Sequence, residues 1–153
     1  MRKIVGALLA LVMAFSLCTI TYAGNTSNIN FTGYTAHIYN YSKIADARQK
    51  LDSSPVYIAI ASASNKQLRV KAEGSNSQNG SFSNCTYNSN AQSVSYVTIS
   101  TEALPLSRRI RSCIYENGFS WGRLSGSTPE VLGNTISGHW SVDSSSTSTP
   151  YAD

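Results

Sequence analysis

Short segments that alternate apolar and polar residues recur along this chain, and stretches rich in Ser, Asn and Gly separate them. In 67–73, Leu68, Val70 and Ala72 fall on one face of a strand. An apolar run at 55–61 precedes it across a short polar connection, which predicts an antiparallel hairpin with one face open to solvent. Further strands are expected at 29–39, 93–100, 119–124 and 131–142.

These segments number about seven, with turn residues roughly every 8–12 positions, a pattern typical of sandwiches and jelly rolls. The sequence therefore predicts an all-β fold, a small antiparallel β-sandwich or jelly-roll-like domain. Two segments add one or two short helices to this expectation. Residues 40–51 carry a helical stripe, although an extended connection fits nearly as well. In 104–117, Ile110 and Ile114 fit helical spacing and Gly118 would end the helix, but a strand is the open alternative.

The beginning of the chain has the features of an export signal. Arg2 and Lys3 precede a nearly unbroken apolar run over 4–20, and Thr21-Tyr22-Ala23 offers small residues for cleavage before Gly24. No later apolar stretch approaches membrane-spanning length, so no transmembrane segment is expected after cleavage. We expect a secreted, extracellular protein with three parts: a signal peptide (1–23), a single β-sandwich domain (24–143) and a polar C-terminal tail (144–153).

Charge is sparse in this chain. Twelve Lys and Arg stand against eight Asp and Glu, and two of the cations lie in the expected signal, so the mature charge is 10 − 8 = +2. A dedicated nucleic-acid binder usually carries a much stronger basic excess. We therefore expect no nucleic-acid partner.

Two cysteines, Cys85 and Cys113, remain after signal cleavage, because Cys18 leaves with the signal. An even number of cysteines in an oxidising compartment favours a disulfide. A bridge would close a loop of about 29 residues and stabilise the fold by roughly 3–4 kcal/mol. Two unpaired thiols or a metal site are the alternatives. The chain has only His37 and His139 and no close Cys/His spacing, so we expect neither a metal nor another cofactor.

Catalysis is poorly supported by the residues present. His139, Ser141 and Asp143 share one face of a strand, but side chains two residues apart lie roughly 6.5–7 Å apart. A nucleophile and its base need about 2.6–3.2 Å, and the chain has no Gly-x-Ser-x-Gly motif. Among the glutamates, Glu116 is the first candidate for acid–base work, with hydrogen bonding to the following turn as the favoured alternative. We expect a protein that is not an enzyme.

A dense basic cluster is the main candidate binding site. Guanidinium groups match the geometry of phosphate and carboxylate groups, so the cluster would contact a cell-envelope component such as an anionic polymer, a lipid headgroup or a glycan. A solvated face that keeps the protein soluble is the equally weighted alternative. The expected binding residues are Arg108, Arg109, Arg111, Trp121 and Arg123.

Tyrosines offer a second kind of surface. Aromatic rings can stack on sugar rings, although core packing is their ordinary role. The candidates for such a stacking platform are Tyr34, Tyr39, Tyr41, Tyr57, Tyr87 and Tyr96.

Three segments carry a family resemblance. Residues 47–57 are similar to an Arg-x-Lys-x-x-Ser-Ser-x-Val-Tyr motif that begins a strand, and 114–119 to a Tyr-Glu-x-Gly-aromatic step. Residues 137–144 are similar to a closing Gly-x-Trp-Ser-Pro-Asp-Ser, with Val142 in place of the proline. Together they resemble an uncharacterised family of small secreted all-β proteins of Gram-positive bacteria, associated with lactococcin-type bacteriocin systems. The resemblance implies an exported all-β fold and carries no catalytic residue.

The expected function is therefore that of a secreted, non-enzymatic protein that acts at the bacterial cell envelope in a bacteriocin-like manner. A carbohydrate- or cell-wall-binding module is the alternative.

Overall fold

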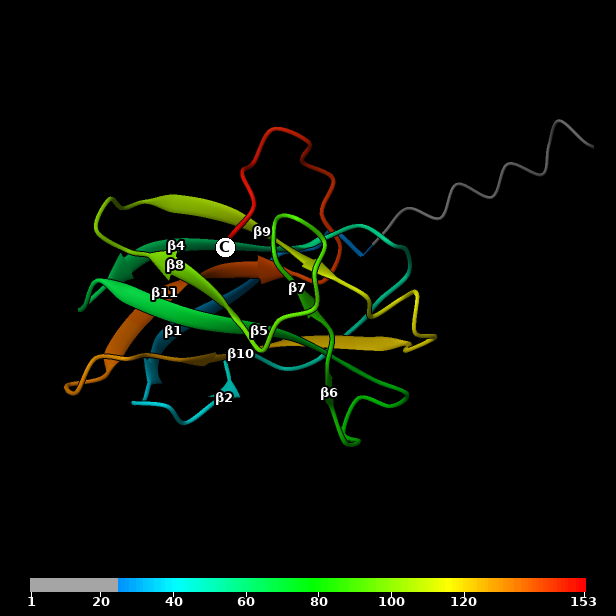
Figure 1. The fold of residues 1–153 in the computed structure, drawn as a ribbon, viewed down its shortest axis with the longest axis horizontal. Coiled ribbons are helices and arrows are strands. Elements are labelled where there is room, and N and C mark those ends of the chain that lie inside the picture. The colour runs from blue at the N-terminus through cyan, green and yellow to red at the C-terminus, as the bar shows by residue number, and fades with distance from the viewer. Residues whose placement is uncertain (1–24) are drawn as a thin grey trace, which may run out of the picture.

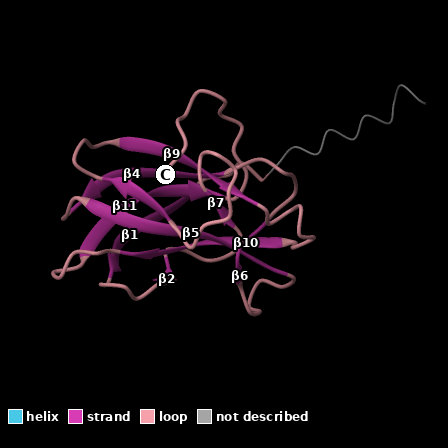
Figure 2. Cartoon of the chain, viewed as in Figure 1, coloured by secondary structure: helices cyan, strands magenta, loops and turns pink. Residues whose placement is uncertain are grey.

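The computed structural model describes residues 25–153, which form strands, turns and loops (Figures 1 and 2). The all-β class is confirmed, and no helix, and hence none that could cross a membrane, occurs in this part of the chain. The expected signal peptide, residues 1–23, lies outside the described residues.

Eleven strands occur between residues 25 and 153, and all pairings between them are antiparallel. In chain order they are β1 (Ile29–Ala36), β2 (Ser42–Lys43), β3 (Arg48–Gln49), β4 (Val56–Ala63), β5 (Gln67–Ser75), β6 (Ser83–Asn84), β7 (Thr86–Tyr87), β8 (Val97–Ser100), β9 (Leu106–Ser112), β10 (Trp121–Ser127) and β11 (Asn134–Ser141).

The strands build two sheets packed as a sandwich. The first has the order β1-β11-β4-β9-β7, and the second has the order β2-β10-β5-β6, with β3 also paired to β10 and β8 to β5. Only Cys85 separates β6 from β7, so this segment passes from one sheet to the other at a corner (Figure 1). On the opposite side, Thr128 N donates to His37 O (3.1 Å), which ties the end of β10 to the residue after β1.

The hairpin expected between 55–61 and 67–73 is wrong. β4 pairs with β11 and β9, whereas β5 pairs with β10 and β8, so the short connection between them carries the chain across the sandwich. The composition of β4 explains the difference. Its continuous apolar run suits a central strand that is paired on both edges, and the second sheet uses the alternating β5 with its polar side outward.

The short helix expected within 104–117 is also wrong. β9 instead pairs with β4, placing Ile110 opposite Val56, with both side chains fully buried. A buried strand needs hydrogen-bond partners for its backbone on both edges. Because β11 satisfies one edge of β4, the other edge requires β9 to be extended.

The helical alternative for 40–51 is wrong for a similar reason. β2 and β3 both pair with β10, and the backbone N–H of Ile44 donates to Leu124 O (2.9 Å). Ile44 and Ala47, whose spacing fits a helical stripe, lie instead in the loop between β2 and β3, and their side chains are buried.

The C-terminal residues pack onto the domain. Tyr151 forms a parallel bridge with Arg109, whose backbone N–H donates to Pro150 O (2.9 Å) and whose carbonyl accepts from Ala152 N (2.9 Å). Ala152 is buried in the core cluster. The segment expected to be a polar tail therefore loops out and returns beside β9 (Figure 1).

Candidate functional site

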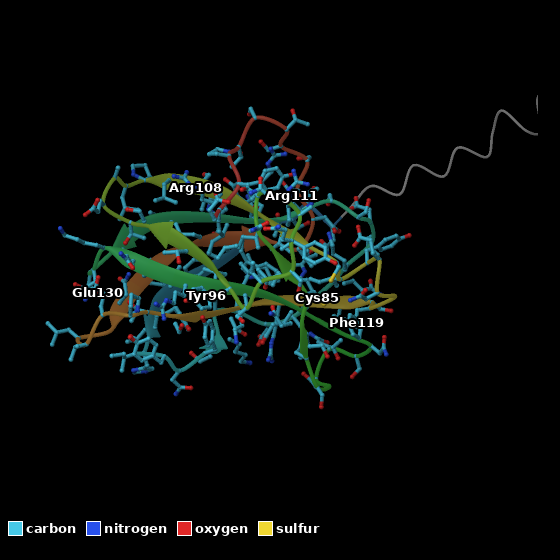
Figure 3. All side chains as sticks on the ribbon, viewed as in Figure 1. Cys85, Tyr96, Arg108, Arg111, Phe119 and Glu130 are labelled. Atoms are coloured by element: carbon cyan, nitrogen blue, oxygen red, sulfur yellow. The ribbon has the colours of Figure 1, made fainter. Side chains whose placement is uncertain are left out.

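The five residues of the expected basic site do not come together. Arg109 and Arg111 alternate with the buried Ile110 on β9 and face outward from the first sheet. Trp121 and Arg123 alternate with core residues on β10 and face outward from the second sheet. Arg108 lies on the same side of β9 as Ile110, and its guanidinium donates to Ser107 O (2.8 Å). Figure 3 shows Arg108 and Arg111 along β9.

Arg109 holds the C-terminal segment. Its Nε donates to Thr149 O (2.6 Å), one terminal nitrogen donates to Ser146 O (3.1 Å), and the guanidinium lies 4.3 Å from the centre of the Tyr151 ring. The guanidinium of Arg111 lies 4.2 Å from the same ring. Much of the donor capacity of Arg109 is therefore used inside the fold.

A pocket of about 250 Å³ lies beside Arg111 and is also lined by Cys113 and Glu116. The hydroxyl of Ser112 and the Nε of Arg111 are buried there without a hydrogen-bond partner. Tyr87, Asn117 and Tyr151 also line this pocket.

The expected disulfide between Cys85 and Cys113 is not formed in the structure, where both are buried free thiols. The two residues lie next to the pair Thr86–Ser112, and Cys113 N donates to Cys85 O (2.9 Å). Cys85 Sγ donates to Ser83 O (3.5 Å), and Cys113 Sγ donates to Cys85 O (3.7 Å) and accepts from Asn117 Nδ2 (3.2 Å). Burial, followed by the proximity of Cys113, raises the pKa of Cys85 to about 12. Within residues 25–153, no three His, Cys, Asp or Glu side chains gather as a metal site would require.

The outer face of the second sheet carries a different cluster, which we name the tyrosine–cation face: Tyr39, Tyr41, Arg69, Lys71 and Tyr96. The Arg69 guanidinium lies between two rings, 5.2 Å from the centre of Tyr39 and 4.7 Å from that of Tyr96. Lys71 Nζ lies 3.7 Å from the centre of Tyr41, and the Tyr41 and Tyr96 ring centres are 6.2 Å apart. Figure 3 shows Tyr96 on this side of the molecule.

Strand pairing assembles the tyrosine–cation face. Arg69 is opposite Ser127 and Lys71 is opposite Ser125 in the β5–β10 pair. The serines are small and fully buried, so the long side chains of β5 and the neighbouring rings lie over them. The hydroxyls of Tyr41 and Ser127 are buried without a hydrogen-bond partner.

The two cations of this face have no ion-pair partner among the described residues. The nearby Arg123 differs, because its Nε pairs with Glu73 Oε2 at 2.7 Å. A cation that lies on an aromatic ring without a carboxylate keeps its charge available to an outside anion.

Tyr39 is the most accessible ring of the face, with 67% of the residue exposed. Its φ of 50° places a bulky residue in the left-handed region, which is uncommon for residues other than glycine. Tyr39 N donates to Thr128 O (3.1 Å), which holds this turn against the end of β10. Strained, exposed residues of this kind cluster at functional sites.

The other expected stacking tyrosines lie elsewhere. The Tyr34 hydroxyl donates to Gly126 O (2.7 Å), and burial raises its pKa above the ordinary value. Tyr57 bonds Ser107 (2.9 Å) on the first sheet, and Tyr87 lines the pocket beside Arg111. Three of the six tyrosines are thus brought together, and the cations that complete the face, Arg69 and Lys71, were not expected.

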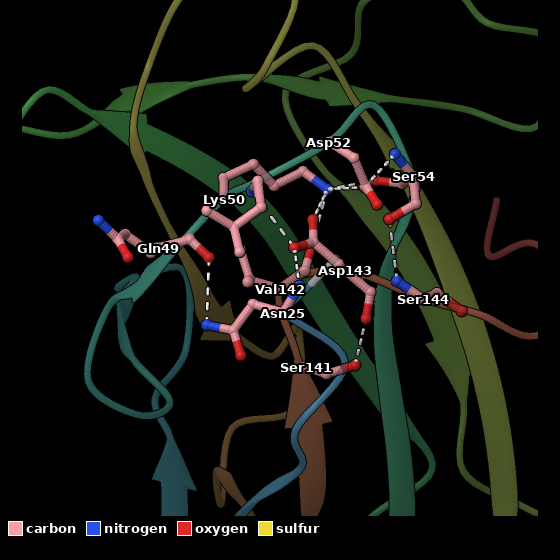
Figure 4. A network of polar contacts seen from close by, with 10 residues as sticks. Asn25, Gln49, Lys50, Asp52, Ser54, Ser141, Val142, Asp143 and Ser144 are labelled. Carbon is pink, nitrogen blue, oxygen red and sulfur yellow. Dashed lines mark hydrogen bonds and ion pairs between the residues drawn. The ribbon is translucent and has the colours of Figure 1, made fainter. Parts of the chain in front are cut away.

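A buried polar network lies near the end of β11 (Figure 4). Lys50 Nζ contacts Asp143 Oδ1 (2.5 Å), and Asp52 Oδ1 lies 3.8 Å from the same nitrogen. Ser141 Oγ donates to the backbone oxygen of Asp143 (2.7 Å), so these two residues do not form a hydrolase arrangement with His139. The sequence motifs at 47–57 and 137–144 contribute Lys50 and Asp143, and nothing in either motif indicates that the two residues are partners.

Comparison with known proteins assigns the chain to a family. No curated protein and no solved structure matches it. A profile of the family described as "Protein of unknown function (DUF2712)" matches residues 19–144. This match spans most of the chain, including both motifs that meet in the buried network. The chain therefore belongs to the DUF2712 family.

Proposed function

We propose that this protein is an exported, non-enzymatic binding protein that attaches to an anionic polymer of the bacterial cell envelope through the tyrosine–cation face. The observation that carries the proposal is the pair of cations, Arg69 and Lys71, that lie on tyrosine rings without a carboxylate partner in the described part of the chain.

The chemistry of the face suits an anionic glycan. Guanidinium and ammonium groups bind phosphate and carboxylate oxygens. The ring of Tyr39 is exposed, and an aromatic face of this kind stacks on the apolar side of a sugar ring. Sugar stacking and anion binding would thus act on one polymer, which unites the glycan and the anionic-polymer expectations.

The expected arginine site supports this function less well. Arg109 is committed to the C-terminal segment, and Arg123 is paired with Glu73. Replacing Arg109 would therefore disturb the fold before it tested binding, whereas Arg69 and Lys71 can be replaced on an outer face.

The test is a cosedimentation assay with purified bacterial cell walls, before and after extraction of their anionic polymers. The double variant Arg69→Gln, Lys71→Gln should weaken binding at least tenfold, because hydrogen bonds to charged groups contribute roughly 1.5–3 kcal/mol each. Tyr39→Ala should also weaken cell-wall binding, without changing the dependence of this binding on salt. Binding of the wild type should fall as salt is raised.

The matched control is Lys66→Gln, Arg108→Gln, which removes the same charge from positions outside the face. Lys66 pairs with Glu102 (3.3 Å) at the surface, and Arg108 belongs to the first sheet. Equal loss of binding in both double variants would show a general charge effect and overturn the proposed face. The same proteins in a growth-inhibition assay test the bacteriocin-like action that the sequence resemblance implies.

A further inference from the structure

Lys50 is held in a dry, fully partnered position. Its side chain is 1% exposed and that of Asp143 is 0% exposed. Around Nζ lie Asp143 Oδ1 (2.5 Å), Val142 O (3.0 Å) and Ser54 O (Figure 4). An ammonium and a carboxylate both lose hydration when they are buried, so each depends on the protein contacts that replace water.

The second oxygen of Asp143 faces backbone donors. Asp143 Oδ2 accepts from Asn25 N (2.5 Å) and from Leu51 N (3.3 Å). Two N–H groups aimed at one oxygen are the arrangement that stabilises the negatively charged oxygen of a tetrahedral intermediate.

A second carboxylate stands beside the nitrogen. Asp52 Oδ1 is 3.8 Å from Lys50 Nζ, and its side chain is 32% exposed. Burial works to raise the pKa of Asp52, but hydrogen bonds from Ser54 and the charge of Lys50 outweigh it and hold the pKa below its usual value. Asp52 is therefore a carboxylate, able to take up a proton from the nitrogen.

We propose that Lys50 and Asp143 condense into an intramolecular isopeptide bond, with Asp52 as the proton carrier. The geometry supplies each part: a nucleophilic nitrogen, a carboxyl carbon next to it, donors for the developing oxyanion, and a base.

The reaction is balanced without an oxidant or a co-reactant. A proton passes from Lys50 Nζ to Asp143 Oδ1, which gives a neutral amine and a carboxylic acid. The two remaining N–H groups of the amine keep their hydrogen bonds to Val142 O and Ser54 O. The lone pair of the nitrogen attacks Cγ of Asp143. A carbon–nitrogen bond forms while Oδ2 carries the negative charge. Asp52 accepts a proton from the nitrogen and returns it to Oδ1, the carbon–oxygen bond breaks, and one water molecule leaves.

Position and burial drive this condensation. Groups held in contact react as if at effective concentrations of roughly 10⁵–10⁸ M, and the departing water leaves a site that bulk solvent does not enter. A cavity of about 240 Å³ lies next to Asp143. In the product, Oδ2 becomes the amide oxygen and keeps both backbone donors.

The test is peptide mapping of the purified protein by mass spectrometry. Trypsin cannot cleave after an acylated Lys50, so the expected product is peptide 49–66 joined to peptide 124–153, lighter than their sum by one water molecule. Lys66 and Glu102 serve as an internal control, because they are paired at 3.3 Å but 74% and 61% exposed and should remain unlinked. A free peptide 51–66 with no joined species would show an ion pair only and overturn the proposal.

Two variants separate chemistry from folding. Asp52→Asn keeps both reacting groups but removes the base, so the linked fraction should fall at least tenfold in protein that still folds. Asp143→Asn should yield the same linked product, with ammonia leaving instead of water. Full linkage in Asp52→Asn would refute the role of Asp52. Absence of the linked peptide in the folded wild type would refute the bond.

Discussion

Gly138→Ala is the substitution whose consequence the structure defines most sharply. Gly138 lies on β11 between Phe31 of β1 and Ile60 of β4, where the ladder with β4 is irregular. A Cβ added at Gly138 would lie 2.0 Å from Ala59 O and 3.0 Å from Ala59 C. Both atoms belong to the backbone of a central strand, so no side-chain rotation can relieve the overlap.

The cost follows from the movement required. Ordinary contact begins near 3.4 Å, so β11 and β4 must separate by about 1.4 Å (3.4 − 2.0) at this point. Such a displacement lengthens the neighbouring ladder hydrogen bonds, each worth about 1 kcal/mol net and more when a buried group is left unpaired. Overpacking alone costs about 1–3 kcal/mol. We expect a loss of about 3 kcal/mol or more, which lowers Tm by roughly 10–15 °C for a domain of this size.

Urea denaturation of wild type, Gly138→Ala and Gly33→Ala measures this cost against a matched control. Gly33 has a φ of +64°, and an added Cβ meets nothing within 4 Å. Gly33→Ala therefore isolates backbone strain, roughly 1–2 kcal/mol. If Gly138→Ala were no more destabilising than Gly33→Ala, the close approach of β11 to β4 would be refuted.

Three further predictions concern thiols, pH and the C-terminus. In the native protein Cys85 and Cys113 should resist iodoacetamide. Denatured, unreduced protein that begins at Gly24, and so lacks Cys18, should titrate two thiols; a count of zero would instead establish the disulfide expected from sequence. Because the Cys85 thiol ionises near 9.0 in the unfolded chain and near 12 in the fold, its contribution is intact below about pH 9 and is lost as pH rises toward 12. Cys85→Ala should flatten that limb of the stability curve in urea titrations, and an unchanged limb would contradict the assignment. Arg109→Ala should expose the C-terminal segment to carboxypeptidase digestion, because it removes charged hydrogen bonds worth roughly 1.5–3 kcal/mol each. Arg108→Ala should not, because the Arg108 guanidinium donates to Ser107 O. Equal digestion rates of the two variants would refute the proposed contact between Arg109 and the C-terminal segment.

The sequence predicted which segments are strands better than it predicted their partners. Alternation in 67–73 reports that one face of β5 is buried, and this is confirmed. Periodicity says nothing about which strand lies beside it, so the short connection to β4 predicts a hairpin, whereas in the structure this connection crosses the sandwich. For 104–117, apolar residues at helical spacing competed with alternation, and pairing with the central strand β4 decided the outcome.

The candidate site was partly accessible to the same reasoning. Tyr39, Tyr41 and Tyr96 were recognisable as an aromatic group, but they precede β2 and β8, and Arg69 and Lys71 come from β5. Only the pairing of these segments in one sheet brings rings and cations together. The Lys50–Asp143 contact spans 93 residues, and no local pattern reports a partner at that separation.

The outer faces of the two sheets differ in whether the protein's own C-terminal segment packs on them. On the first sheet, the C-terminal segment returns to β9, Arg109 donates to its carbonyls, and Tyr151 packs on Arg109 and Arg111. These arginines are therefore already occupied by the protein's own backbone and ring. On the second sheet, no such segment within residues 25–153 covers Arg69 or Tyr39, and the serines opposite Arg69 and Lys71 are small and buried. A ligand that needs both a cation and a ring would find the two together on the second face, which is why we propose binding at β5 and not at the denser arginine run of β9.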